Sequence, residues 1–266
     1  MAEQPPKSPA RRTRPEDEPL IAAAQQALET ELLFGGEFLP SAPRQVGQAA
    51  PASVEGGGLG AMTREQKAQI LSQMDVQEVR GCNKCRLSQD RTQTVFGEGD
   101  SDADLVFIGE GPGEEEDRTG RPFVGRAGEL LTTMIKAMGL RREQVYICNL
   151  VKCRPPGNRV PAADEADACW PYLLRQLQTL EPKVIVTLGN PATQRLLDTR
   201  VGITRLRGLW QKLPPFAVGL GGVDVMPTFH PAFVLRQYTP ETRRKVWSDL
   251  QQVMDRLGIQ APKSRG

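Results

Sequence analysis

The sequence predicts an α/β fold: a three-layer α/β/α domain with a central, mostly parallel, four-stranded sheet, preceded by a disordered N-terminal arm. Apolar runs of strand length alternate with segments of helical period, which is typical of a parallel sheet covered by helices on both faces. The first apolar run ends in glycines, as a buried strand does where it enters a loop. Residues 1–62 lack both patterns, so the domain is expected to span residues 63–266.

Strands and helices are expected in alternation along this domain. Residues 64–82 have a helical pattern that leads to Cys82. The remaining elements are a strand within 103–111, a helix over 127–140, a strand within 144–153, a helix over 164–182, a strand, turn and helix over 183–197, a short strand within 224–231 and a closing helix around 245–258. In such sheets ligands bind beyond the carboxyl ends of the strands. Three unusual segments fall at those ends: GEGPG, CNLVKC and TFHP.

Composition places the chain among globular proteins that bury a sizeable core. Of its 266 residues, 39% are hydrophobic and 25% are charged. No apolar run approaches the ~18 residues of a membrane helix, and the N-terminus lacks the apolar core of a secretory signal. Residues 1–62 have a net charge of −3 and residues 63–266 a net charge of +5. A mildly basic domain permits contact with a polyanion, but this balance is equally typical of an ordinary solvated surface.

The N-terminal arm contains one segment of different character. Residues 1–18 are charged and rich in proline, and residues 36–62 are dominated by Gly, Pro, Ala and Ser, so neither has the apolar content to order. Between them, residues 19–34 place apolar side chains at helical spacing, and Gly35 and Gly36 supply a stop. This amphipathic helix is predicted to dock either on a partner protein or on the chain's own domain.

Four of the five cysteines are spaced as ligands of one metal centre. Cys82 and Cys85 form a CxxC pair, and Cys153 and Cys169 follow singly. A redox pair has no use for the two later cysteines, whereas four thiolates suit structural zinc or an iron–sulfur cluster. Spacing leaves those two alternatives open. Cys148 stands within the apolar run VYICNLV and is expected to be part of the core.

Candidate binding residues gather at the strand ends. The turn Gly109-Glu110-Gly111 follows the first strand, where glycines let the backbone approach a ligand closely. Phe123, in the next glycine-rich loop, is expected to be a core plug or a stacking surface for a ring. Asn149 ends a strand with an amide suited to reading one edge of a base. His230, the only histidine, follows the last strand; an isolated histidine is more often structural than catalytic.

These motifs together resemble the family 4 uracil-DNA glycosylases, which carry an iron–sulfur cluster. The segments that carry the resemblance are CNKC, VFGEGDSDADLVFIGEGPGEEEDRTGRPFVGRAGELL, VYICNLVKCRPPGNRVP, the surroundings of Cys169, RLRGLW and PTFHPAFVLR. The resemblance extends from about Thr63 to Leu257 and leaves residues 1–62 outside. One departure is Cys148, where the family often has threonine.

The resemblance implies that the protein excises uracil from DNA by hydrolysing the N-glycosidic bond after the base has flipped out of the stack. Phe123 would stack on the flipped base, Asn149 would bind the O4/N3 edge of uracil, and His230 would donate to uracil O2 as negative charge develops there. The backbone of Gly109 to Gly111 would contact the base. Glu110 would orient the attacking water or stabilise the sugar cation. No lysine stands in a Schiff-base motif, so a monofunctional enzyme is expected.

The resemblance also implies a [4Fe–4S] cluster of structural role, held by Cys82, Cys85, Cys153 and Cys169. The implied partner is uracil-containing DNA, single- or double-stranded, and a replication or repair protein is the candidate partner of residues 19–34. We expect a monomer associated with the nucleoid of a bacterial cytoplasm. Five basic residues beside the motifs are candidates for phosphate contacts: Lys152, Arg154, Arg159, Arg205 and Arg207.

Two other classes stay in view. One is a related glycosylase branch with a different preference for damaged bases, or one that links covalently to DNA. The covalent branch has a basic insertion that contains a histidine, and this chain has no second histidine. The other is a non-catalytic iron–sulfur or zinc module that recruits a replication protein through residues 19–34. Phe123, Asn149 and His230 argue against that class, because a binding module needs no base pocket.

Overall fold

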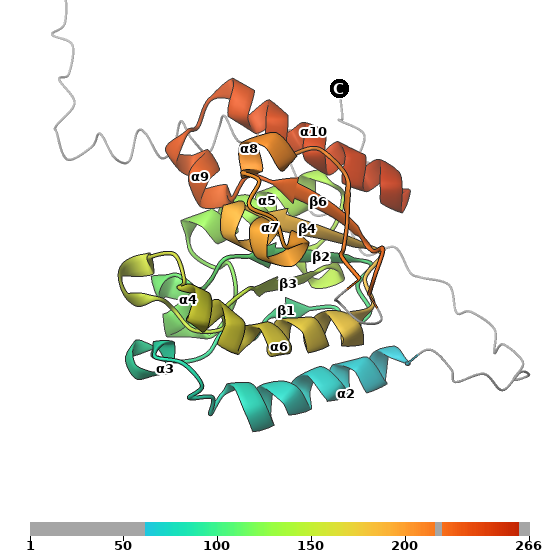
Figure 1. Cartoon of the computed structure of the whole chain (residues 1–266). Helices are drawn as coiled ribbons and strands as arrows, with labels where there is room; N and C mark the ends of the chain where they lie inside the picture. Colours follow the sequence, from blue (N-terminus) through green and yellow to red (C-terminus); the bar gives the residue numbers. More distant parts are fainter. Residues whose placement is uncertain (1–61, 216–219, 261–266) are drawn as a thin grey trace, which may run out of the picture. The chain divides into compact units, whose positions relative to one another are not determined.

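A mixed, mostly parallel sheet of six strands forms the centre of the computed structural model, which describes residues 62–215 and 220–260 (Figure 1). The strand order is β1-β3-β2-β4-β6-β5. The four strands that the sequence predicts are parallel to one another: β2 (Leu105–Gly109), β3 (Tyr146–Asn149), β4 (Val184–Leu188) and β6 (Asp224–Thr228). The helix predicted over residues 19–34, with the rest of the arm, lies outside the described residues.

The prediction of a four-stranded sheet was wrong by two edge strands. β1 (Glu98–Gly99) pairs antiparallel with β3, and β5 (Gln211–Lys212) pairs antiparallel with β6. Each is two residues long, which is too short for an alternating pattern to show in the sequence. They border the parallel strands on both sides and make the sheet mixed.

Burial explains why the central strands are continuous apolar runs. Every residue of β2 and of β4 is buried, as expected of parallel strands that are covered on both faces. The register aligns Gly109 with Asn149, and Leu188 with Thr228. The carboxyl ends of the strands therefore meet along one edge of the sheet, which is the edge that positions the site.

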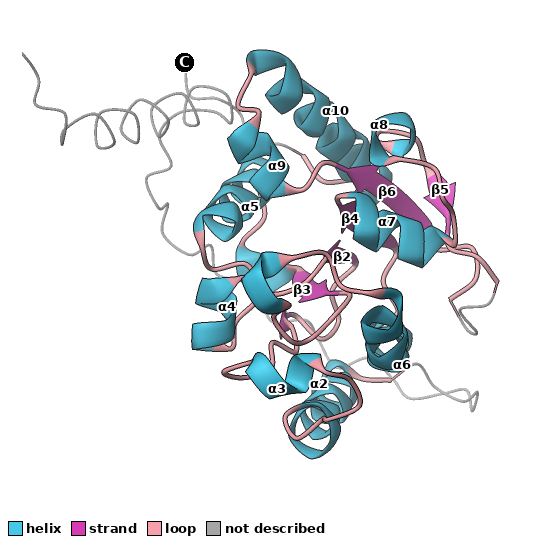
Figure 2. Cartoon of the chain, turned by 60° about the vertical axis from the view of Figure 1, so that its left-hand side comes forward, coloured by secondary structure: helices cyan, strands magenta, loops and turns pink. Residues whose placement is uncertain are grey.

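Helices cover both faces of the sheet (Figure 2). On one face, α6 (Ala163–Leu180) and α7 (Asn190–Leu197) share a hydrophobic core with Val106 and Ile108. The intervening strand residues point the other way, toward the face that α5 (Arg126–Ala137) and α10 (Pro240–Leu257) cover.

The helix boundaries follow from local capping. The Thr63 hydroxyl accepts from the N–H of Gln66, whose side chain accepts in return from the N–H of Thr63, and this box begins α2 (Arg64–Met74). The α-helix predicted over 64–82 is shorter than expected, because a π-helical turn, Asp75–Val79, follows it. Gly258, with φ of 66°, ends α10.

Further short elements lie between these helices: α3 (Leu87–Asp90), α4 (Glu114–Thr119), α8 (Ile203–Leu206), α9 (Pro231–Arg236) and the 3₁₀ turns Arg142–Gln144 and Pro156–Asn158. None of the helices in the described ranges is both long and apolar enough to cross a membrane.

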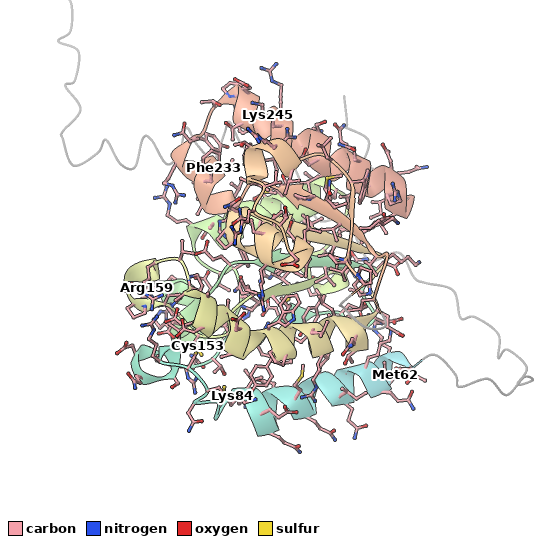
Figure 3. The ribbon with its side chains drawn as sticks, viewed as in Figure 1. Met62, Lys84, Cys153, Arg159, Phe233 and Lys245 are labelled. Carbon is pink, nitrogen blue, oxygen red and sulfur yellow. The ribbon has the colours of Figure 1, made fainter. Side chains whose placement is uncertain are left out.

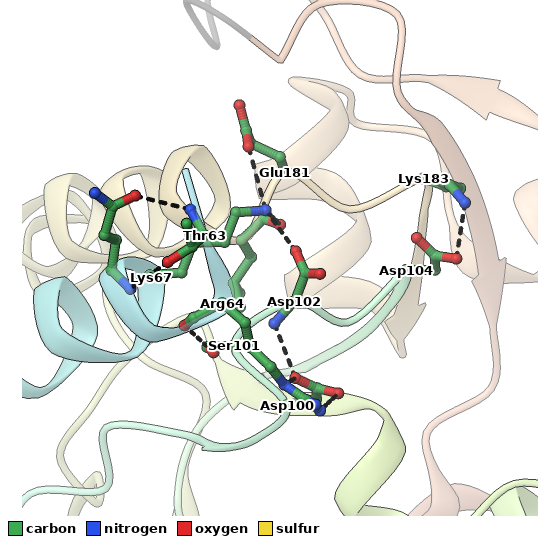
Figure 4. A network of polar contacts seen from close by, with 11 residues as sticks. Thr63, Arg64, Lys67, Asp100, Ser101, Asp102, Asp104, Glu181 and Lys183 are labelled. Atoms are coloured by element: carbon green, nitrogen blue, oxygen red, sulfur yellow. Dashed lines mark hydrogen bonds and ion pairs between the residues drawn. The ribbon is translucent and has the colours of Figure 1, made fainter. Parts of the chain in front are cut away.

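Polar contacts fasten α2 to the loop before β2 (Figure 4). Nε of Arg64 donates to Asp100 at 2.7 Å, and the hydroxyl of Ser101 donates to the main-chain oxygen of Arg64 at 2.9 Å. The buried Nζ of Lys67 donates to Asp102 at 2.8 Å. These contacts attach the N-terminal helix of the described chain to the unit that contains the sheet.

Candidate active site

A cavity of about 600 Å³ opens at the carboxyl edge of the sheet. Its wall contains residues that follow β2, β3, β4 and β6, so the parallel topology builds it from four separate parts of the chain. Arg159 and Phe233, two of the lining residues, lie on the same side of the molecule (Figure 3). Volumes of this size are typical of sites that enclose a small organic ligand. Five of the six base-site residues predicted from the sequence line the cavity: Glu110, Gly111, Phe123, Asn149 and His230.

Asn149 presents an unpaired oxygen in this wall. The residue is 1% exposed, and its Oδ1 has no hydrogen-bond partner in the described part of the chain. A buried acceptor left unpaired costs ~1–3 kcal/mol, so the site favours a ligand that brings a donor. The sixth predicted residue, Gly109, lies directly behind this amide. A Cβ at position 109 would lie 2.4 Å from Oδ1 of Asn149 and 2.5 Å from Cζ of Phe123.

Phe123 is held in a strained backbone conformation. Its φ of 51° lies in the left-handed region, which residues other than glycine rarely adopt. Nη1 of Arg142 donates to its main-chain oxygen at 3.0 Å. A Cβ on Gly128 would lie 2.0 Å from that same carbonyl, so the start of α5 packs directly on it. Strain of this kind persists where the surroundings over-determine it, as at binding sites.

Glu116 is a site residue that the sequence reasoning missed. Its carboxylate accepts from the main-chain N–H groups of Gly113 at 3.0 Å, Val124 at 2.8 Å and Gly125 at 2.9 Å. Through these hydrogen bonds, Glu116 holds the loop that contains Phe123 against the start of α4. A glycine at the start of a helix, followed three residues later by a glutamate, matches half of a capping box. This spacing is the sequence signal by which the role of Glu116 could have been predicted.

His230 is a neutral hydrogen-bond donor at neutral pH. It caps α9, and its Nδ1 accepts from the N–H of Ala232 at 3.1 Å. A ring nitrogen that accepts has no proton, so the neutral imidazole has its proton on Nε2. Burial, helped by the charge of Arg236, lowers the pKa of His230 to about 4. The centroids of the His230 and Phe123 rings lie 5.6 Å apart.

Glu110 is a lining residue whose carboxylate can serve as a general base. The residue is half-buried, and burial alone raises the pKa of its carboxyl. Within residues 62–215 and 220–260 no cation or donor pairs with it. A carboxylate that lacks a protein partner and lines a cavity is free to act on a water or a developing positive charge.

The four predicted ligand cysteines share one region of the structure. Cys153 and Cys169 are buried, and Cys82 and Cys85 are half-buried against the same core. Burial, with a smaller contribution from the neighbouring Cys153 and Cys85, raises the pKa of Cys169 to about 11. In the sequence, Lys84 lies between Cys82 and Cys85. Figure 3 shows Cys153 on the same side of the molecule as Lys84. Cys148 is fully buried in the core, as predicted.

The described residues contain no group of three or more His, Cys, Asp or Glu side chains close enough to hold a single metal ion. Donors nevertheless point to two of the sulfurs. Nη1 of Arg91 donates to Sγ of Cys153 at 3.0 Å, and the main-chain N–H of Lys152 donates to Sγ of Cys169 at 3.5 Å. Such N–H···S bonds stabilise negative charge on sulfur.

The five candidate phosphate contacts fall into two groups. The prediction for Lys152 was wrong: the residue is 1% exposed and its Nζ donates inward, because Lys152 lies in the core three residues after β3. Arg207 is largely buried against Asp249, which holds its guanidinium away from solvent. Arg154, Arg159 and Arg205 lie at least partly at the surface.

Comparisons with known proteins converge on one family. The family model described as "Uracil DNA glycosylase superfamily" matches residues 96–251. A type-4 uracil-DNA glycosylase from Thermotoga maritima is 49% identical over 193 residues, which cover 71% of this chain and 94% of the relative. The type-4 enzyme of Sulfurisphaera tokodaii is 46% identical over 187 residues, covering 67% and 81%. A type-5 uracil-DNA glycosylase from Pyrobaculum aerophilum is 31% identical over 149 residues, covering 50% and 63%.

The fold and the cavity define an α/β protein with a ligand-sized cavity at the carboxyl edge of the parallel strands of a mixed sheet. The residues that wall the cavity lie inside the matched segment. The chain belongs to the uracil DNA glycosylase superfamily, and the higher identities to the type-4 enzymes place it in the type-4 group.

Proposed function

We propose that this chain excises uracil from DNA by hydrolysing the N-glycosidic bond, as in base excision repair of deaminated cytosine. The observation that carries the proposal is the unpaired Oδ1 of Asn149 in a cavity that Phe123 and the neutral His230 also line. Uracil brings a flat ring, an N3–H donor and two carbonyl acceptors, which complement these three groups. The type-4 relatives are uracil-DNA glycosylases by name, which agrees with this chemistry.

Phe123 and Asn149 recognise the base. Stacking of the flipped uracil on Phe123 contributes ~1–3 kcal/mol. Oδ1 of Asn149 accepts from uracil N3–H, and its amide nitrogen donates to O4. Cytosine has a bare acceptor at N3 and an amino donor in place of O4, so in the same amide orientation both hydrogen bonds are lost, at ~1–3 kcal/mol each. The base must first leave the helix, which costs a few kcal/mol and is least costly where pairing is already weak.

His230 and Glu110 act on the charges that develop as the bond breaks. The base departs with negative charge on O2, and Nε2–H of His230 donates to that oxygen. Because the pKa of His230 is about 4, the ring is neutral at pH 7 and acts as a hydrogen-bond donor rather than as a cation. The unpaired carboxylate of Glu110 stabilises the cationic sugar and orients the attacking water. No lysine of the described ranges lines the cavity, which supports a monofunctional reaction that leaves an abasic site.

The donor set fits the [4Fe–4S] cluster that the sequence resemblance implies. It consists of four thiols, two of which already accept N–H···S bonds. Cys82 and Cys85 before α3, Cys153 after β3 and Cys169 on α6 would hold the cluster and so connect these three parts of the chain. Hydrolysis needs no electron transfer, so we propose a structural role.

DNA is proposed to lie across the mouth of the cavity. Arg154 and Arg159 come from the loop that lines it, and Arg205 from α8, so their charges can contact the phosphates that flank a flipped nucleotide. We further propose that residues 63–266 form the glycosylase domain, that the protein acts as a monomer in a bacterial cytoplasm, and that residues 19–34 recruit a replication or repair protein.

Release of free base tests the proposed function directly. The full chain, purified without oxygen, is incubated with single- and double-stranded oligonucleotides that contain one uracil, cytosine or thymine, and the released base is quantified. We expect free uracil and an intact abasic strand, with no release of cytosine or thymine. Absence of free uracil from both substrates, with a folded protein, would contradict the proposal. Strand cleavage without added base would contradict the monofunctional reaction.

A further inference from the structure

Asp249 is a buried carboxylate that lies behind the wall of the cavity. It belongs to α10, it is fully buried, and it is not one of the residues that line the cavity. The hydroxyl of Thr228 donates to its Oδ2 at 2.6 Å, and Nε of Arg207 donates to the same oxygen at 3.1 Å. Nη2 of Arg207 donates to Oδ1. Both carboxylate oxygens therefore have donors, one of them a cation, and such bonds fix the orientation of the group.

The segment RLRGLW, residues 205–210, supplies this arginine and packs against the carboxylate. The segment begins within α8, and α8 and α10 both lie beside β6 (Figure 2). Gly208 has a φ of 72°, and a Cβ at this position would lie 2.7 Å from Oδ1 of Asp249. Nη2 of Arg207 also donates to the main-chain oxygen of Lys245 at 2.7 Å. The arginine and the glycine of the motif are therefore explained by their packing on α10 rather than by contact with the base.

The same contacts hold the last residues before His230. The main-chain N–H of Gly208 donates to the main-chain oxygen of Pro227 at 3.1 Å. The guanidinium carbon of Arg207 lies 5.7 Å from the centroid of the Phe229 ring, within the range of a cation–π interaction. Phe229 itself lines the cavity. Together with the hydroxyl bond to Asp249, these contacts hold three consecutive residues: Pro227, Thr228 and Phe229.

The position of His230 depends on this end of β6. The hydrogen bond to its Nδ1 comes from Ala232, within the helix that His230 itself caps, so this bond orients the ring relative to α9 only. On the side of β4, the N–H of Gly189 donates to the main-chain oxygen of Thr228 at 2.9 Å. A Cβ on Gly189 would lie 2.9 Å from Cβ of His230. The place of the Nε2 donor is therefore set by where β6 ends and α9 begins.

We propose that Asp249 is a positioning residue, which fixes the end of β6 through Thr228 and Arg207 and so places the Nε2 donor of His230 at uracil O2. This inference rests on the proposed function, in which His230 stabilises the leaving base. Such a donor must lie about 2.7–3.1 Å from the oxygen that becomes negative. A misplacement of ~1 Å that originates away from the chemistry can lower a rate by ~10²-fold. Asp249 lies outside the cavity lining, so its effect on the reaction passes through His230.

A double-mutant cycle tests this role in the full chain purified without oxygen. It compares the wild type with Asp249→Asn, with His230→Ala and with the variant that contains both substitutions. Asparagine keeps the shape of the aspartate but removes its charge and one of its two acceptor oxygens. The single-turnover rate of uracil release is measured at saturating enzyme, together with the dissociation constant for uracil-containing DNA and the melting temperature.

We expect Asp249→Asn alone to lower the single-turnover rate by ~10–100-fold, with little change in DNA affinity. In the His230→Ala background the same substitution should lower the rate by less than about threefold, because the donor that Asp249 positions is already missing. A merely structural role would lower the rate by the same factor in both backgrounds. Equal factors, an unchanged rate in Asp249→Asn, or a change confined to DNA affinity or melting temperature would each overturn the proposal.

Asp224→Asn is the matched control. Asp224 begins the same strand at its other end, where Arg256 and Lys212 pair with it. This variant also removes a carboxylate that an arginine binds, and it is expected to release uracil at the wild-type rate. A loss as large as that of Asp249→Asn would overturn the proposal, because loss of either ion pair on β6 would then have the same effect.

Variants of Thr228 cover the case in which Asp249→Asn does not fold. Thr228→Val removes the hydroxyl that donates to Asp249 but keeps the shape of the side chain, so uracil release should slow. Thr228→Ser keeps the hydroxyl and should retain most of the wild-type rate. Equal rates in these two folded variants would overturn the proposal.

The cycle also separates this role from the proposed function. Failure of the wild type to release uracil refutes the proposed function itself. An unchanged rate in His230→Ala refutes the role of His230 and with it the positioning by Asp249. An active wild type and a slow His230→Ala variant, with equal losses on addition of Asp249→Asn to each, refute the positioning role alone.

Discussion

Gly109 and Asn149 are paired residues at the carboxyl ends of β2 and β3. A Cβ on Gly109 would lie 2.4 Å from Oδ1 of Asn149, so any larger residue at position 109 would displace the Asn149 amide. The same missing side chain gives the ring of Phe123 its position against β2. Gly109 therefore positions both the Asn149 amide and the Phe123 ring, although it has no reactive side chain of its own.

We predict that Gly109→Ala lowers the single-turnover rate of uracil release by ~10–100-fold. The added methyl group would displace Asn149 and Phe123, and overpacking of this kind costs ~1–3 kcal/mol. Gly202→Ala is the matched control, because at Gly202 the nearest atom to a new Cβ lies 4.0 Å away. A folded Gly109→Ala protein with the wild-type rate would show that the amide position is not critical.

Replacement of His230 by alanine should reduce the excision rate much more than the affinity for DNA. Its donor works on charge that appears only as the bond breaks, and loss of one such donor typically costs ~10²–10³-fold in rate. Single-turnover kinetics and DNA binding are measured together. If the rate is unchanged, the histidine only caps α9, and the backbone of Gly109 to Gly111 stabilises the leaving base instead.

The pH profile of excision should lack a histidine ionisation near pH 6.5. Because the pKa of His230 is lowered to about 4, the ring stays neutral as the pH falls from 8 to about 5. Burial raises the pKa of Glu110, so the rate should fall on the acid side as that carboxylate takes up a proton, and Glu110→Gln should remove this limb. A step near pH 6.5 that His230→Ala abolishes would refute the neutral-donor assignment.

Stability should depend on pH in the same range. The unfolded chain binds a proton at His230 near its ordinary pKa of 6.5, whereas the folded chain binds it only near pH 4. The folded state is therefore destabilised as the pH falls from about 6.5 to about 4. Denaturant unfolding at pH 7 and pH 5 should show a smaller pH-dependent loss in His230→Ala than in the wild type.

Cys169→Ala should lose the cluster, whereas Cys148→Ala should retain it. Cys169 belongs to the four-thiol set, while Cys148 is packed inside the core on β3. The wild type is expected to be brown, with about four irons and about four sulfides per chain. Iron, sulfide and visible absorbance are determined for all three proteins. A colourless wild type that holds zinc after purification without oxygen would contradict the cluster.

A truncation that begins at Met62 should fold and release uracil at the rate of the full chain. It keeps Thr63, whose side chain caps α2, and the contacts of Arg64 and Lys67 that attach this helix to the loop before β2. Circular dichroism and single-turnover kinetics compare the two proteins. A folded truncation that is inactive would place part of residues 1–61 in the active site.

Much of this protein could be predicted from local sequence signals. Buried apolar runs marked β2, β3, β4 and β6, because parallel strands covered on both faces leave no polar alternation. The same rule placed the turn Gly109-Glu110-Gly111, Asn149 and His230 at one edge of the sheet, and the cavity does lie there. The two-residue strands β1 and β5 were missed, since pairing with a neighbour, not any pattern of their own, makes them strands.

The tertiary structure alone determined the contacts of side chains whose partners are distant in the chain. The sequence predicts Lys152 at the surface, in contact with phosphate. In the structure it is buried, and its Nζ donates to Gln176, twenty-four residues later on α6. Glu116 likewise has partners in a separate loop: the loop of Phe123 folds back so that the N–H groups of Val124 and Gly125 join that of Gly113 at its carboxylate. Sequence patterns report burial and period because these are properties of short segments. The pairing of a buried charge depends on which segments meet, and folding alone determines that.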